Sequence, residues 1–203
     1  MQTKDHVLLA NWLMREGEER FSRRFLAGVR FGSFFPDRNP ITYLRGIGGK
    51  QGLHGHNAEI TEKAIGATLD RLMSAGVSGR GYWNGVRLGM ALHYLADAFT
   101  YPHHKYYKGS LSQHMAYEAA LHRVFIGYLK ESVTPVWQCT LSFSDYLDEM
   151  LHLYHQCAGS PQTDCRFITL MCQMAFHGAV TRKEREEEYY ENSDYHRSVP
   201  AVR

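Results

Sequence analysis

Apolar side chains recur at helical spacing along most of this 203-residue chain, and that periodicity limits the fold more than any other feature. No segment shows convincingly the two-residue alternation that is typical of a half-buried strand. We therefore predict an all-α fold that forms a single multi-helix domain. The expected helices cover residues 5–16, 18–31, 57–76, 82–99, 111–131, 143–158 and 162–180.

Helix-end signals support these spans. Gly76 follows the third expected helix, where glycine commonly closes a helix. Ser110 and Gln113 have the spacing of a capping box, so we expect the fifth helix to begin there. The pair Ser160-Pro161 is typical of the start of a helix and opens the last one.

Two segments break the helical pattern. Residues 32–55 contain prolines, many glycines and several aromatic side chains, which predicts a long, ordered and functional loop. The chain becomes largely polar after residue 181, as is typical of a mobile end. We expect one helical domain over residues 1–180 and a polar, mobile tail over residues 181–203.

Composition excludes several classes of protein. The chain has 23 basic and 21 acidic residues, a net charge of +2, so we expect no stable nucleic-acid partner. Neither a secretory signal nor an apolar run of roughly 20 residues is apparent, which favours a cytoplasmic protein without a transmembrane segment. The cysteines lack metal-ribbon or redox spacing, and we expect them to be buried thiols: Cys139, Cys157, Cys165 and Cys172.

Histidine is unusually frequent, with 12 residues, and one short stretch carries two pairs of histidine and acid. His93 and Asp97 lie four residues apart, as do His114 and Glu118, so each pair shares one face of a helix. Apolar residues continue both faces, which places the pairs toward the core. Each pair alone could be an ordinary helix contact, but burial of both is costly without a divalent cation. Imidazole and carboxylate without thiolate favour zinc in a catalytic setting.

The order of these motifs resembles the zinc-dependent phospholipase C family, whose all-α fold is shared with fungal single-strand zinc nucleases. The segments ALHYLADAFTYPHH and HMAYE are similar to the family's H-Y-x-x-D, proline-containing turn and H-x-x-x-E. Upstream, FGSFFPDRNPITYLRG resembles its G-x-x-x-P-D segment, and GHNAE resembles its next histidine motif. The resemblance covers roughly residues 5–125.

This resemblance implies two zinc sites. It assigns one zinc to Asp37, His56, His93 and Asp97, and a second to His103, His114 and Glu118. Two choices stay open at this point. His103 has the family's spacing from Asp97, but His104 is an alternative, and His54 is an alternative to His56.

A third zinc is implied by the resemblance of His6 to the family's N-terminal histidine. Exported relatives complete that site with the amine and carbonyl of a processed N-terminal tryptophan and a bridging aspartate. This chain begins MQTKDH, so a third zinc would need His6, Asp97 and water or a further group. His6 could equally be an ordinary residue at the start of a helix.

Clustered zinc ions support hydrolysis of a phosphate ester by an activated water. By resemblance we expect a phospholipase C-like phosphodiesterase acting on a small phosphodiester or a phospholipid head group. Asp37 is the candidate general base, with pure zinc ligation as the alternative. A zinc-dependent nuclease or nucleotide phosphodiesterase, or a non-catalytic module that zinc stabilises, are the other hypotheses. The sequence leaves the oligomeric state undetermined.

Overall fold

The computed structural model describes residues 1–15, 20–38, 58–77, 81–131 and 142–197, with the backbone alone for 58–63, 131 and 181–197. Within these ranges the chain is helical and contains no strand, as predicted. The helices are α1 (Thr3–Arg15), α2 (Arg23–Arg38), α4 (Ala58–Ala75), α5 (Tyr82–Ala98), the short 3-10 turn η3 (Tyr101–His103), α6 (Leu111–Glu131), α7 (Phe143–Cys157) and α8 (Pro161–Arg197).

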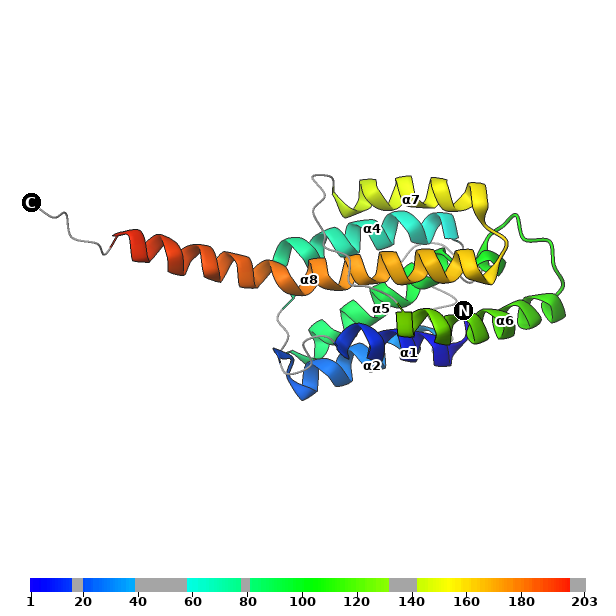
Figure 1. The fold of residues 1–203 in the computed structure, drawn as a ribbon, viewed down its shortest axis with the longest axis horizontal. Helices are drawn as coiled ribbons and strands as arrows, with labels where there is room; N and C mark the ends of the chain where they lie inside the picture. The colour runs from blue at the N-terminus through cyan, green and yellow to red at the C-terminus, as the bar shows by residue number, and fades with distance from the viewer. Residues whose placement is uncertain (16–19, 39–57, 78–80, 132–141, 198–203) are drawn as a thin grey trace, which may run out of the picture.

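Helix α5 is the centre of the bundle. Nearly every residue from Gly85 to Ala98 is buried, including residues on opposite faces of the helix. A helix that is apolar all round must be covered on all sides. In Figure 1, α5 lies between α4 and α7 on one side and α1 and α2 on the other, with α8 running along the bundle.

Helices α2 and α5 approach one another through glycines spaced four apart on each helix. A Cβ atom added at Gly32 would overlap the carbonyl oxygen of Val86, and one added at Gly89 would overlap that of Val29. Gly28 and Gly85 form the neighbouring contact in the same way. The two backbones therefore touch directly, and no larger residue fits between them.

The prediction of a loop over residues 32–55 was wrong for residues 32–38, which are helical. Helix α2 continues to Arg38, with Pro36 inside its last turn. Gly32 does not form a turn but packs against α5. Pro36 has no backbone amide to donate, but it lies in the last turn, so only the end of the helix is affected. Asp37 consequently lies on a helix, while residues 39–55 fall outside the described residues.

The predicted helix ends are confirmed at three positions. Gly76 follows α4 with a positive φ of 61°. Ser110 and Gln113 exchange hydrogen bonds of 2.7 and 3.3 Å before α6, which is the reciprocal capping box. Ser160 accepts a bond from the Thr163 amide at the start of α8.

The C-terminal helix is longer than its sequence pattern indicated. The backbone of α8 continues through Arg197 and extends beyond the rest of the bundle in Figure 1. The proposed boundary at residue 180 therefore lies within a continuous helix. No helix among the described residues combines the length and the apolar character needed to cross a bilayer.

The described cysteines are free thiols, but they differ in exposure. Cys165 and Cys172 are buried as expected, whereas Cys157, the last residue of α7, is exposed. Cys139 lies outside the described residues.

Candidate metal centre

The central helix α5 places His93 and Asp97 one turn apart inside the bundle. His93 Nε2 lies 3.3 Å from an Asp97 oxygen, and the His93 side chain is fully buried. On its other side, His93 Nδ1 donates to the carbonyl of Ser33 on α2, at 2.8 Å. Because a carbonyl only accepts, this bond fixes the proton on Nδ1 and turns Nε2 toward the acids.

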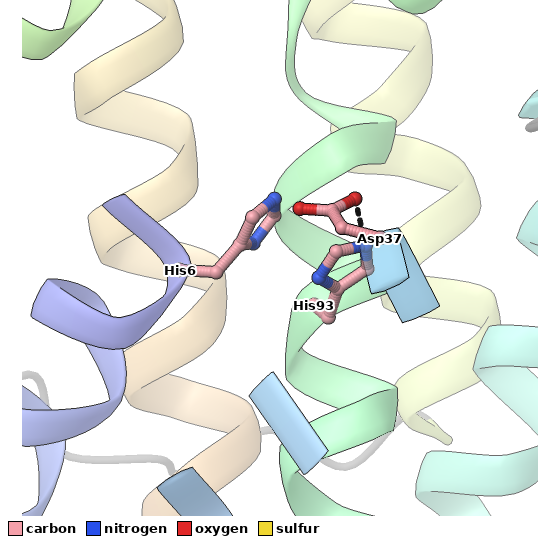
Figure 2. A group of neighbouring side chains, drawn as sticks. All are labelled: His6, Asp37 and His93. Atoms are coloured by element: carbon pink, nitrogen blue, oxygen red, sulfur yellow. Dashed lines mark ion pairs between the residues drawn. The ribbon is translucent and has the colours of Figure 1, made fainter. Parts of the chain in front are cut away.

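His6 and Asp37 join His93 to form what we call the deep group: His6, Asp37 and His93, whose ligand atoms lie within 4.8 Å of one another. Figure 2 shows that the three side chains converge from α1, α2 and α5. Asp37 lies 3.5 Å from His93 Nε2, and the His6 and His93 rings stack at 3.8 Å. Neither His6 Nδ1 nor Asp37 Oδ2 has a hydrogen-bond partner among the described residues, while His6 Nε2 lies 3.2 Å from Asp97 Oδ1.

The outer group consists of His103, His114 and Glu118, whose ligand atoms also lie within 4.8 Å of one another. The η3 turn directly after α5 brings His103 back against the first turns of α6. Glu118 Oε1 lies 3.3 Å from His103 Nε2 and 3.2 Å from His114 Nε2. This group is nearer to solvent, since the His114 side chain is 29% exposed.

Asp97 connects the two groups. Its Oδ2 faces His93, whereas its Oδ1 lies 3.2 Å from His6 and 3.3 Å from His103. Burial alone would raise the pKa of the Asp97 carboxyl, but His103 and the N-terminal ammonium hold it well below its usual range. Asp97 is therefore an anion that both groups share.

The α-amine of Met1 also points into the centre. It lies 3.1 Å from Asp97, 3.0 Å from Glu118 and 2.9 Å from His103 Nε2. Burial disfavours its charge, but Asp97 and Glu118 outweigh that effect and raise its pKa. The ammonium thus neutralises the two acids in this structure.

The donor set fits zinc. Burial, reinforced by the neighbouring His93, lowers the pKa of His6 to about 4, so its ring is neutral at pH 7. His6 offers a neutral imidazole whose Nε2 faces the Asp97 carboxylate, and Asp37 offers a buried oxygen without a hydrogen-bond partner among the described residues, so both can serve as metal ligands. Neither group contains a thiolate, which favours a catalytic over a structural zinc site.

The structure brings together seven of the eight residues that the sequence proposed as metal ligands. They are His6, Asp37, His93, Asp97, His103, His114 and Glu118. The eighth, His56, lies outside the described residues, as does its alternative His54. His6 lies with Asp37 and His93 and also 3.2 Å from Asp97, its expected partner in a third site.

The two adjacent histidines of the turn occupy different surroundings. His103 faces Asp97 and Glu118, whereas the buried ring of His104 stacks on Tyr106 at 4.9 Å and packs edge-on against His155. Burial lowers the pKa of His104 to about 4. Among the described residues, His104 contacts no member of either metal-ligand group through a hydrogen bond or ion pair.

Three polar groups in or near the centre were not predicted from the sequence. The Met1 amine contacts Asp97, Glu118 and His103, and no motif in the sequence indicates these contacts. Asp5 is buried and pairs with His122, joining α1 to α6 beside the centre. Asp164, at the start of α8, is distant in sequence from all the ligands and has no spacing that reveals it.

A family model described as zinc-dependent phospholipase C matches residues 5–164. The match covers most of the chain and includes all eight expected ligands, from His6 to Glu118. Searches of the curated proteins and of the solved structures found no match.

Proposed function

The chain belongs to the zinc-dependent phospholipase C family, and from that premise we propose that it hydrolyses phosphodiesters with zinc held by the deep and outer groups. One observation carries this proposal: the carboxylate of Asp97 reaches both groups from a single buried helix. A shared carboxylate keeps two cations close together, as in hydrolases whose two metals contact one phosphate.

The proposed ligands follow from the contacts. His93, Asp97 and Asp37 would hold the deep ion, with His56 as a further expected ligand. His103, His114 and Glu118 would hold the outer ion, and a site with three protein ligands would leave a position for water. A third ion would take His6 and Asp97 together with water or a further group.

When bound, zinc lowers the pKa of a water molecule toward neutrality and neutralises charge on phosphate oxygens. The chain's own residues prepare the site for this chemistry. The Ser33 carbonyl orients His93, and Asp97 supplies negative charge between the groups. Asp37 directs Oδ1 to His93 while its Oδ2 makes no hydrogen bond among the described residues, so that oxygen is placed to accept a proton.

The outer group defines the side from which substrate approaches. The exposed fraction rises from none for the His93 side chain to 29% for His114. A phosphate that enters past His114 would meet the residues of the outer group first. The nearly balanced charge of the chain favours a small phosphodiester or a phospholipid head group over a long polyanion.

The test combines metal analysis with a phosphodiester assay. We expect at least two zinc ions per chain and hydrolysis of a bis-aryl phosphate that a chelator abolishes and added zinc restores. Fully metallated protein that hydrolyses no phosphate ester in a broad screen, with coordinatively closed zinc, would contradict the proposal. That result would instead support a helical module in which zinc serves folding.

A further inference from the structure

A buried carboxylate outside both metal groups joins the elements that carry the outer ligands. Asp164 lies in the first turn of α8 and is completely buried. Its Oδ1 accepts a 2.7 Å bond from the Tyr154 hydroxyl. Its Oδ2 accepts from the Tyr117 hydroxyl at 3.0 Å and from the Tyr101 backbone amide at 2.9 Å.

Two of the three donors to Asp164 lie close to proposed metal ligands in the chain. Tyr117 directly precedes Glu118 on α6, and Tyr101 begins the η3 turn that ends at His103. The rings of Tyr101 and Tyr117 also pack together, with centroids 5.8 Å apart. One carboxylate therefore joins the turn that carries one outer ligand to the helix that carries the other two.

The three hydrogen bonds of Asp164 are those expected of an ionised carboxylate. A carboxylate accepts only, and here each of its three neighbours donates. Desolvation of a buried carboxylate is costly, so such a network often adds less stability than an apolar replacement of the same volume. An apolar residue at this position could not accept the hydrogen bond from the Tyr101 amide.

We propose that Asp164 is a positioning residue for the outer metal ion, holding His103 in register with His114 and Glu118 through Tyr101 and Tyr117. This inference rests on the proposed function, because it assumes that the outer group binds metal. Loss of a residue that orients metal ligands commonly lowers metal affinity about 10- to 100-fold. We expect Asp164→Asn to weaken the outer ion by a factor in that range and to leave the deep ion bound.

The deciding experiment titrates metal-free full-length protein with Zn²⁺ against a chromophoric chelator, and with Co²⁺ while following its absorption spectrum. A matched pair of variants separates positioning from stability. Tyr117→Phe and Tyr154→Phe each remove one hydroxyl from Asp164, the first on the ligand-bearing α6 and the second on α7, which carries no proposed ligand. Tyr117→Phe should weaken the outer ion and change its Co²⁺ spectrum more than Tyr154→Phe does.

The pair keeps the test decisive even if Asp164→Asn does not fold. Equal affinities of the outer ion in the two tyrosine variants, or affinities that follow only their melting temperatures, would overturn the inference. Wild-type protein that binds the outer ion but hydrolyses no phosphodiester would contradict the proposed function, while the affinity differences would still support the role of Asp164. Wild-type protein that binds no outer ion would overturn both.

Discussion

The deep and outer groups contain similar ligands but lie in different environments. His6 and His93 of the deep group are almost wholly buried, between helices whose backbones are held close by glycines. The outer group lies on a short turn and the partly exposed beginning of α6. The deep ion should therefore contribute to the stability of the fold, whereas the outer ion should be exchangeable and face the substrate.

The largest effect should come from the residue that the two groups share. Asp97→Asn removes the anion that faces His6, His103 and the Met1 ammonium. We expect both ions and all activity to be lost, with the free energy of unfolding lowered by about 3–5 kcal/mol. Metal analysis and denaturant unfolding measure these effects. Asp37→Asn is the control and should affect the deep ion more than the outer one, whereas two ions retained in Asp97→Asn would show that Asp97 does not bridge them.

Removing one histidine from each group tests the difference in burial directly. In metal-free protein, His93→Ala leaves a cavity and removes the hydrogen bond to the Ser33 carbonyl, which should cost about 2–4 kcal/mol. His114→Ala alters a partly exposed side chain and should cost less than about 1 kcal/mol. Chemical denaturation of the two metal-free variants gives both values. Equal costs would mean that the two groups do not differ in their contribution to folding.

Stepwise metal removal should distinguish the two ions. A chelator added to the metallated protein should extract the outer zinc first, with activity lost at that step and the melting temperature largely unchanged. Glu118→Gln should mimic this state, with kcat lowered at least about tenfold and one zinc retained. Metal content and activity measured on the same samples check the order, which would be contradicted if both ions left together.

The smallest effect concerns the neighbouring histidines of the turn. His104→Phe should retain both zinc ions and the stacking on Tyr106, with less than about 1.5 kcal/mol lost. His103→Phe, its matched partner, should lose the outer ion. Zinc analysis of the two variants decides between the alternatives that sequence spacing left open, and the reverse pattern would identify His104 as the ligand.

Helices were predictable here because apolar spacing and capping residues act over a few neighbouring positions. The capping box of Ser110 and Gln113 is an example, since both of its bonds depend on residues three apart. Gly32 misled the prediction because its local preference for a loop is outweighed by packing against α5. That packing depends on residues more than fifty positions away.

The same distinction applies to the candidate centre. The pairs on α5 and α6 follow from helical spacing, and the resemblance supplied Asp37 and His6. The contacts of the Met1 amine and of Asp164 depend on how separate helices meet, which no local pattern encodes. His103 and His104 differ by one position in a turn, so only the path of the backbone after α5 separates them.

The glycine contact between α2 and α5 affects which substitutions this centre can accept. Asp37 lies on one of these helices, and His93 and Asp97 lie on the other, so the spacing of the ligands is set by two touching backbones. A backbone contact has no rotamers with which to adapt to a changed neighbour. Side chains elsewhere in the core can therefore diverge in sequence without altering the distance between these ligands, while any side chain added at Gly32 or Gly89 would push them apart. Across related chains, we expect small residues at these two positions to persist together with the ligands, even where the surrounding core has been replaced.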